Sequence, residues 1–199
     1  MLRERVAREA ALLLYSSQEK EFKQAKQRAA EILKTRNLPS NREVAEELDR
    51  IVEERESATR KRLLLRMRRE AQEIMTALKD YSPRLIGSVW RGTARQNSDI
   101  DILAYDQDTR QVLNQFQKQN YKIKGSEWSS VTKEGKKETS FHIHIILPSG
   151  DETEVVVRSL NYLGQSERCE TYGDVKTGLS LNQLTKILKE NPLQKFVPT

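Results

Sequence analysis

The sequence predicts an α+β fold, with a mixed or antiparallel sheet flanked by helices and preceded by an all-helical extension. Between Leu2 and Lys79 there is no glycine and only one proline, Pro39, which favours helices. After Tyr81 the chain changes to β-branched runs separated by Gly, Pro, Asn and Asp, the pattern of strands joined by turns. We therefore expect a helical extension over residues 1–80 and an α+β domain over residues 81–199.

Two capping boxes mark helix starts in the extension. Ser16-Ser17-Gln18-Glu19 and Ser40-Asn41-Arg42-Glu43 each place a glutamate three residues after a serine, so that each side chain can bond the other residue's backbone N–H. We expect helices to begin near Ser17 and Asn41. Apolar residues recur at helical spacing between these points, at Phe22, Ala25, Ala29, Ile32 and Leu33.

The helix that begins near Asn41 has no proline or glycine to stop it before Lys79. An unbroken helix over this range would be roughly 60 Å long at 1.5 Å per residue. A kink near Ser57–Thr59 is the alternative.

The α+β domain is expected to contain five strands and two helices. The expected elements are strands at Arg84–Ile86 and Asp99–Tyr105, a helix at Thr109–Lys118 with Asp108 as its cap, a hairpin of Tyr121–Thr132 and Glu138–Leu147 across the turn Lys133–Lys136, a strand at Glu152–Arg158, and a helix at Ser180–Glu190 capped by Ser180.

Composition limits the classes of protein that this chain can belong to. Its apolar runs are far shorter than the roughly 20 residues that a membrane-spanning helix needs, and the charged N-terminus does not resemble a signal peptide. The single cysteine, Cys169, excludes an internal disulfide, so we expect a cytoplasmic protein without a membrane partner. The net charge of +6 favours polyanionic partners such as nucleic acid or nucleoside triphosphates; a solvated surface without a partner is the alternative.

The stretch from Gly87 to Asp101 has the composition of a phosphate and metal site. Gly87-Ser88 follows a predicted strand, and a residue without a side chain there lets the backbone approach a phosphate closely. Asp99 and Asp101 are two residues apart on the next predicted strand, so both carboxylates project from one face. Mg²⁺ prefers carboxylate and phosphate oxygens, and we expect it, or alternatively Mn²⁺, between these two side chains.

These motifs resemble the signature of the polymerase-β-like nucleotidyltransferases, in which Gly-Ser, Arg-Gly and Ser-Asp-Ile-Asp-Ile occur in this order. The resemblance covers Arg84–Tyr105 directly and does not extend to the N-terminal helices. It implies that Gly87 and Ser88 hold the β- and γ-phosphates of a nucleoside triphosphate (NTP) while Asp99 and Asp101 bind the metal. An acceptor hydroxyl would then attack the α-phosphorus, and pyrophosphate would leave.

The resemblance also implies a third carboxylate on a later strand beside the Asp-Ile-Asp strand. Glu154 is the first candidate and Glu152, which shares its face, is the second. The family usually has Asp at this point, so a Glu leaves an altered or weakened metal site open. Arg91 is a candidate for pairing with the triphosphate; a salt bridge that fixes the helix is its structural alternative.

Two histidines and two tryptophans carry less specific signals. His142 and His144 share one strand face, where structural roles are favoured over a metal site, and contact with nucleotide or acceptor is the alternative. Trp90 and Trp128 are more typical of packing than of stacking on a base.

The run from Arg60 to Arg69 holds only basic and apolar residues, and it lies on a predicted helix. Such a stripe could follow the phosphate backbone of RNA. The alternative is an amphipathic helix whose arginines cover the domain or pair with its acids.

The sequence therefore predicts an enzyme that transfers a nucleoside monophosphate from an NTP to RNA, a protein or a small molecule in a Mg²⁺-dependent reaction. Two alternatives remain open. One is a catalytically weak nucleotide- or RNA-binding module, which the Glu in the third position would suit. The other is the nucleotidyltransferase half of a toxin-antitoxin pair that modifies a partner protein.

Overall fold

The computed structural model describes residues 2–133 and 136–198. It divides into two compact units: a helical unit of the chain up to Arg60 with Glu167–Val175 and the C-terminal end from Pro198, and a sheet unit of Lys61–Ser166 and Lys176–Val197. The boundary at Arg60 lies next to the stretch Ser57–Thr59, where the sequence allows a kink. That residues 1–80 and 81–199 fold as separate domains stays a prediction.

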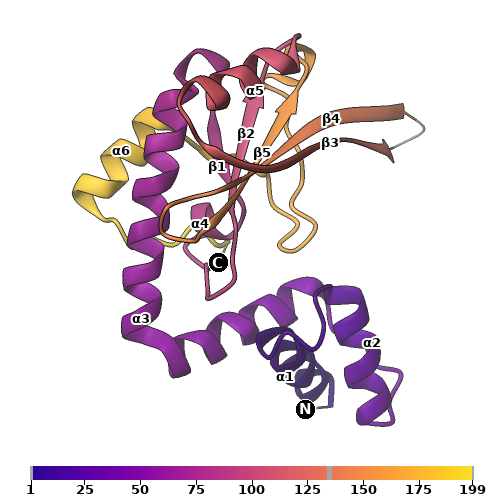
Figure 1. Ribbon diagram of the computed structural model, residues 1–199. Helices are drawn as coiled ribbons and strands as arrows, with labels where there is room; N and C mark the ends of the chain where they lie inside the picture. The colour runs from indigo at the N-terminus through magenta and orange to yellow at the C-terminus, as the bar shows by residue number, and fades with distance from the viewer. Residues whose placement is uncertain (1, 134–135, 199) are drawn as a thin grey trace. The chain divides into compact units, whose positions relative to one another are not determined.

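The helical unit is built from α1 (Leu2–Tyr15), α2 (Phe22–Ile32) and the first part of α3 (Asn41–Ala77), and α1 and α2 lie side by side (Figure 1). Alanines at the contact let helix backbones approach closely, and larger apolar residues fill the space around them. The buried residues of this core include Val6, Ala7, Ala10, Ala11, Leu14, Ala25, Ala29, Val44 and Ile51.

One of the two predicted capping boxes is confirmed. The Ser40 backbone N–H donates to Glu43 Oε2 at 2.7 Å, the Glu43 N–H donates to Ser40 Oγ at 3.2 Å, and α3 begins at Asn41. The helix start predicted near Ser17 is wrong. Ser17 has a φ of 56° in the turn that follows α1, and α2 begins at Phe22 without a side-chain cap. The two serines lie in the turn that ends α1, so the capping-box pattern there does not begin a helix.

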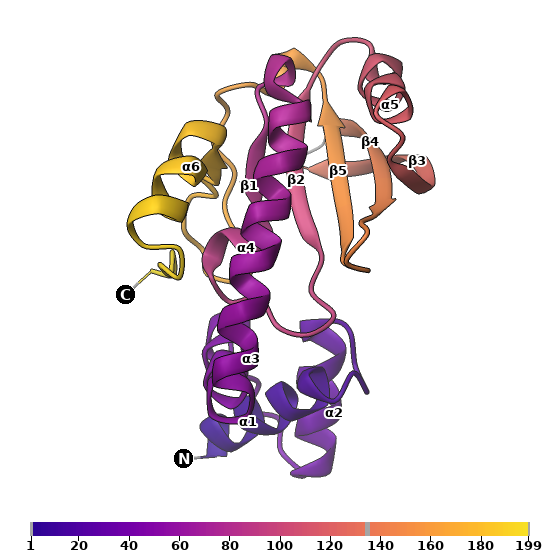
Figure 2. The same cartoon turned by 60° about the vertical axis from the view of Figure 1, so that its left-hand side comes forward.

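The second part of α3 belongs to the sheet unit. It ends at Ala77, two residues before the predicted Lys79, which lies in the 3₁₀ turn Lys79–Tyr81. Figure 2 shows α3 passing in front of β1 and β2. Its buried residues pack into the main core of the unit; they are Leu64, Met67, Ala71, Ile74, Met75 and Leu78.

A six-stranded mixed sheet forms the centre of the sheet unit, in the order β3-β4-β5-β2-β1-β6. Only β2 and β5 run parallel; the other neighbours are antiparallel. The strands are β1 (Arg84–Ile86), β2 (Ile100–Tyr105), β3 (Lys122–Lys133), β4 (Lys136–Ile146), β5 (Glu152–Arg158) and β6 (Leu179–Ser180).

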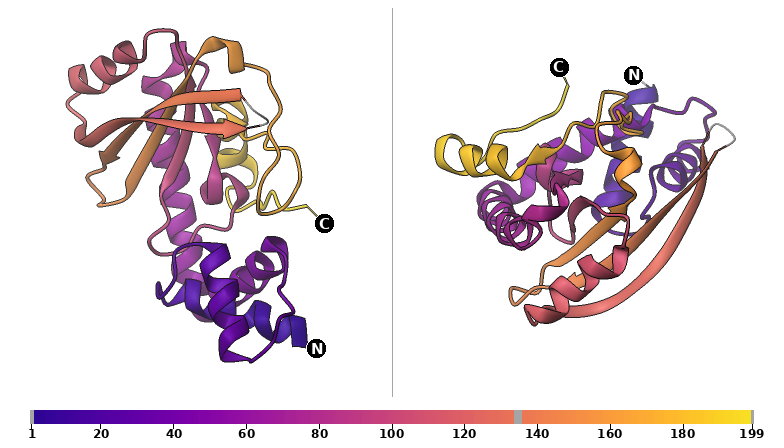
Figure 3. Two further views of the ribbon diagram at one scale, coloured as in Figure 1. Left: turned by 90° about the vertical axis from the view of Figure 1, so that its right-hand side faces the viewer. Right: turned by 90° about the horizontal axis from the view of Figure 1, so that it is seen from above.

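The five predicted strands are confirmed to within a few residues, whereas β6 was not expected. The β3–β4 hairpin extends away from the other strands (Figure 3). Residues 134 and 135 of the predicted turn lie outside the described residues. A two-residue strand such as β6 has no pattern of its own, which is why the sequence does not reveal it.

The sheet unit contains three helices besides α3: α4 (Gly87–Arg91), α5 (Thr109–Lys118) and α6 (Leu181–Glu190). Side chains near their first residues cap the last two. The Asp108 side chain accepts from the Arg110 N–H at the start of α5, as predicted. Ser180 caps α6, and Gln183 completes a capping box with it.

The two faces of the sheet differ in chemistry because side chains alternate along each strand. One face is apolar and packs against α3, α5 and α6; its buried residues include Leu85, Ile100, Ile102, Ile143, Val155 and Val157. The opposite face, which we call the polar face, carries the alternating residues Asp101, Glu152, Glu154, His142 and His144. The apolar side chains that stabilise the fold thus lie on one face of the sheet, and the candidate functional side chains lie on the other.

No helix within residues 2–133 and 136–198 combines the length and the apolar composition needed to cross a membrane.

Candidate active site on the polar face

Asp101 and Glu154 lie side by side at the centre of the polar face. They are direct partners in the parallel pair of β2 and β5, so their backbones are one strand spacing, about 4.8 Å, apart. Asp99 immediately precedes β2 and is exposed. The structure therefore places Asp101 beside the first candidate for the third carboxylate, with Asp99 two residues before Asp101 in the chain.

Gly87 is the first residue of α4, directly after β1, and it is held against Asp101. Its φ is +70°, and a Cβ atom added to it would lie 1.9 Å from Asp101 Oδ2. Glycine is thus required here both by the left-handed backbone and by the close approach of the carboxylate. The sequence pointed to Gly87 for phosphate contact; the structure adds a direct packing role beside Asp101.

Burial, and after it the charge of neighbouring carboxylates, raises the pKa of both aspartates. Burial, with further repulsion from Glu154 and Asp99, raises the pKa of Asp101 to about 7, while Lys176 acts in the opposite direction. Burial and the carboxylates of Glu152 and Glu154 raise the pKa of Asp99 as well. Carboxylates gathered in this way favour a bound cation, because it would offset their mutual repulsion.

The donor chemistry of this site fits a hard divalent cation. The converging groups are carboxylates, which supply the oxygen ligands that Mg²⁺ prefers. Among the described residues, no three His, Cys, Asp or Glu side chains are already gathered as a metal-binding group. Mg²⁺ is commonly held by one or two carboxylates together with substrate phosphates, so the arrangement suits an ion that binds with its nucleotide.

Glu154 and Glu152 have different partners. Glu154 Oε1 lies 2.7 Å from His142 Nδ1, and His142 Nε2 lies 2.8 Å from Ser140 Oγ. Glu152 instead accepts a hydrogen bond from Lys124 Nζ at 2.6 Å. Glu152 precedes the residues of β5 that pair with β2, whereas Glu154 pairs with Asp101. The register thus places Glu154 beside Asp101, whereas the charge of Glu152 acts more strongly than that of Glu154 on Asp99.

A cavity of about 550 Å³ adjoins Asp99 on the β3, β4 and β5 side of the sheet. The residues that line it are polar or charged apart from one glycine, with more acidic than basic side chains: Asp99, Lys124, Gly125, Ser126, Glu127, His144 and Glu152. His144 Nε2 lies 3.8 Å from Glu127 Oε1. This cavity is large enough for a small ligand or for the reacting end of a larger one.

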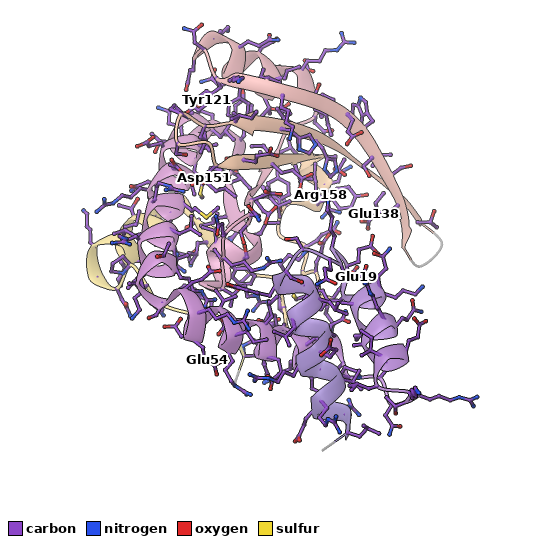
Figure 4. All side chains as sticks on the ribbon, turned by 60° about the horizontal axis from the view of Figure 1, so that its bottom comes forward. Glu19, Glu54, Tyr121, Glu138, Asp151 and Arg158 are labelled. Atoms are coloured by element: carbon purple, nitrogen blue, oxygen red, sulfur yellow. The ribbon has the colours of Figure 1, made fainter. Side chains whose placement is uncertain are left out.

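The far end of the polar face is neutralised by an ion pair. Arg158 on β5 donates to Glu138 Oε2 on β4 at 2.9 Å, and both residues are labelled in Figure 4. The Arg158 guanidinium also lies over the Tyr162 ring, 4.4 Å from its centroid. Excess negative charge on this face is therefore concentrated around Asp101.

Arg91 has a structural environment. Its side chain is buried, Nη1 donates to the Phe196 carbonyl oxygen at 2.8 Å, and the guanidinium lies 4.1 Å from the centroid of the Trp90 ring. These contacts favour the alternative in which Arg91 fixes the helix. Trp90 is buried in the core, as expected for packing, whereas Trp128 is 64% exposed and packs its ring on Phe141.

In the run from Arg60 to Arg69, three arginines favour the alternative in which they cover the domain or pair with its acids, and RNA binding by this helix stays a prediction. Arg60 is 3% exposed and pairs with Asp49 and Glu53 inside the helical unit. Arg68 is fully buried in the sheet unit, and Arg66 forms a bidentate pair with Asp151 at 2.8 and 2.9 Å. Lys61, Arg62 and Arg69 remain exposed.

Sequence reasoning missed two residues that the structure brings to the site. For His142 a structural role was favoured and contact with nucleotide or acceptor was the alternative; its bond to the candidate third carboxylate was not predicted. Lys176 lies 75 residues beyond Asp101 in a segment without a motif, yet its charge acts on that carboxyl. The alternation of His142 and His144 was a usable signal for the first; no local signal identifies Lys176.

A sequence model of a family described as "Domain of unknown function (DUF4269)" matches residues 69–154. This range includes α4, both aspartates and Glu154, but less than half of the chain. The chain matches no curated protein.

Solved structures with partial likeness are nucleotidyltransferases or their complexes. A cytoplasmic RNA terminal U-transferase is 18% identical, with a TM-score of 0.35 over 51% of this chain and 30% of that one. The GLD-2/RNP-8 complex is 15% identical, with a TM-score of 0.34 over 50% of this chain and 38% of that one. Cid1 with bound MgGTP is 19% identical, with a TM-score of 0.30 over 50% of this chain and 33% of that one. This chain thus covers little more than a third of these proteins at most.

Proposed function

We propose that the protein is a Mg²⁺-dependent nucleotidyltransferase, which moves a nucleoside monophosphate from an NTP to an acceptor. One observation carries the proposal: the Asp101 carboxylate is packed against the backbone of Gly87 and lies beside Glu154 on the parallel strand. A turn that can approach a phosphate and carboxylates that can hold a cation thus meet at one point.

Each element of the site has a role in this proposal. Asp99, Asp101 and Glu154 would hold the cation, and the backbone around Gly87 and Ser88 would contact the triphosphate. When bound, Mg²⁺ would neutralise negative charge on the phosphates during in-line displacement. An acceptor oxygen would form its bond to the α-phosphorus as the bond from that phosphorus to the pyrophosphate oxygen breaks.

The strand order suggests where the two substrates bind. The Gly87 turn follows β1 on one side of β2, whereas the cavity lies on the other side, over β5, β4 and β3. We place the triphosphate on the first side, with Lys176 as a cation near it, and the acceptor in the cavity. The acidic lining of the cavity opposes a polyanion and favours a neutral or cationic acceptor group.

Metal-dependent nucleotide binding tests this proposal. We expect a non-hydrolysable ATP or UTP analogue to bind the wild-type protein much more tightly with Mg²⁺ than with EDTA, as measured by isothermal titration calorimetry. Asp101→Asn should remove the Mg²⁺ effect while circular dichroism shows an unchanged fold. Equal binding with Mg²⁺ and EDTA, or an unchanged Mg²⁺ effect in Asp101→Asn, would contradict the assignment.

A further inference from the structure

A chain of side chains on the polar face links Ser140, His142 and Glu154. Ser140 Oγ lies 2.8 Å from His142 Nε2, and His142 Nδ1 lies 2.7 Å from Glu154 Oε1. The side chains of His142 and Glu154 are 20% and 30% exposed, so water competes only partly for these bonds. Such a chain restricts the rotation of the carboxylate at its end.

The direction of these hydrogen bonds follows from the chemistry of the groups. An ionised Glu154 can only accept, so Nδ1 of His142 must carry the hydrogen and donate to Oε1. In the neutral imidazole Nε2 then accepts, and the Ser140 hydroxyl is the donor to it. The Glu154 carboxylate, which can only accept, therefore fixes the tautomer of His142, and the Ser140 hydroxyl, which can donate or accept, completes the chain.

We propose that His142 is a positioning residue for the third carboxylate of the site. Glu154 pairs in register with Asp101 on one side and with His144 on the other, and His142 reaches it from the diagonal position on β4. By holding Oε1, His142 would keep the second oxygen of Glu154 available to a cation shared with Asp101. This inference rests on the proposed function, because it assigns His142 a role toward the metal of that site.

The same three residues also resemble a nucleophile, base and orienting acid, but the sheet register opposes that role in nucleotidyl transfer. Phe141 pairs with Val157, which places Ser140 next to Arg158, four residues along β5 from Glu154. Four residues of strand span about 13 Å of backbone, and the His142 imidazole lies between Ser140 and Glu154, so Ser140 does not adjoin a nucleotide held at Asp101. Positioning of Glu154 is the role that the geometry supports.

Two substitutions at His142 separate positioning from bulk packing. The amide nitrogen of Asn is as many bonds from Cβ as Nδ1 of His, so His142→Asn can still donate to Glu154. The amide nitrogen of Gln corresponds to Nε2, so His142→Gln loses that donor position. The test is the affinity of each variant for Mn²⁺, measured by electron paramagnetic resonance of the free ion, with and without a non-hydrolysable ATP analogue.

We expect His142→Gln to weaken Mn²⁺ binding about 10-fold or more, as is typical for loss of a group that orients a metal ligand. His142→Asn should stay close to wild type, and Ser140→Ala should show an intermediate loss. Thermal unfolding of each variant confirms that it is folded. Wild-type Mn²⁺ affinity in His142→Gln, or equal losses in the Asn and Gln variants, would overturn the inference.

Asp101→Asn, measured in the same series, distinguishes the failure of this inference from the failure of the proposed function. If Asp101→Asn binds Mn²⁺ like wild type, the metal site itself is wrong and the inference falls with it. If Asp101→Asn loses the ion while His142→Gln keeps wild-type affinity, only the role of His142 is overturned.

Discussion

Asp101 is held between an uncharged backbone and two further acids. Gly87 closes one side of its carboxylate, and Glu154 and Asp99 repel it from others. Ile100 and Ile102, on either side of Asp101 in β2, pack into the core, whereas the Asp101 side chain lies on the opposite face. The hydrophobic core therefore gives no reason for an acid at position 101. In the proposed function, a bound cation would offset this repulsion.

The stability of the metal-free protein should depend on pH through Asp101. Its pKa of about 7 in the folded protein lies above the ordinary value of 3.8, so the folded state binds this proton more tightly than the unfolded chain does. The free energy of unfolding should consequently fall as pH rises from about 4 to about 7. Removing the charge with Asp101→Asn should recover up to about 4 kcal/mol at pH 8.

Urea unfolding in EDTA at pH 4.5 and pH 8 measures this effect. We expect Asp101→Asn to be clearly more stable than wild type at pH 8 and to differ much less at pH 4.5. Asp80→Asn, which changes an exposed carboxyl, serves as the matched control. A variant that is less stable than wild type at pH 8 would show that the Asp101 charge is satisfied by the protein itself.

The two candidates for the third carboxylate should differ in effect. Glu154 pairs in register with Asp101, whereas Glu152 is bonded to Lys124. We expect Glu154→Gln to lower the rate of nucleotidyl transfer by about 100-fold or more, and Glu152→Gln by less than about 10-fold. Steady-state kinetics on the same acceptor compare the two, and the reverse order would move the site by two residues along the same face.

At the scale of elements, Arg68 joins α3, α4 and the C-terminal segment. Its guanidinium donates to the carbonyl oxygens of Val89 and Trp90 at 3.1 and 3.0 Å, and to those of Pro192 and Gln194 at 2.7 and 2.8 Å. Burial lowers the pKa of Arg68 to about 10, so the group remains charged at neutral pH. It thereby satisfies carbonyl groups at the end of α4, next to the candidate site.

Arg68→Met should destabilise the protein by about 2–4 kcal/mol, because it leaves these carbonyl groups without their charged donor. Arg69→Met changes an exposed neighbour on the same helix and should stay within about 0.5 kcal/mol of wild type. Chemical denaturation measures both values. Equal, small effects would mean that other contacts hold the C-terminal segment in place.

Short sequence patterns predicted most helices and strands, but they could not predict contacts between residues far apart in the chain. The Ser40 and Ser180 caps act within one helical turn, so the sequence alone identifies them. Arg68 looks like any other arginine in a basic helix, and only its partners more than 100 residues away make it a buried residue. The incorrect helix start predicted at Ser17 shows that a capping-box pattern can also occur in the turn that ends the preceding helix.

At the scale of the whole molecule, net charge was a poor guide to the site. The chain carries a formal charge of +6, yet the polar face gathers carboxylates around Asp101 and the cavity is acidic. The spacing of Asp99 and Asp101 predicted acids at the start of this strand, and the structure pairs Asp101 with Glu154; that these residues form the site stays a prediction. The contact of His142 with Glu154 depends on strand register, for which the alternation of His142 and His144 was the one available signal. Lys176 lies in a distant segment that no pattern in the sequence marks.

The most direct test of the central claim compares two positions of a radioactive label in the same NTP. Purified protein is incubated with Mg²⁺, total cellular RNA and protein, or small acceptors, together with either α-³²P- or γ-³²P-labelled NTP. A nucleotidyltransferase leaves the α-label on the acceptor and releases the γ-label as pyrophosphate, and Asp101→Asn should give no labelled product. Transfer of the γ-label, or α-label transfer that persists in Asp101→Asn, would contradict the account.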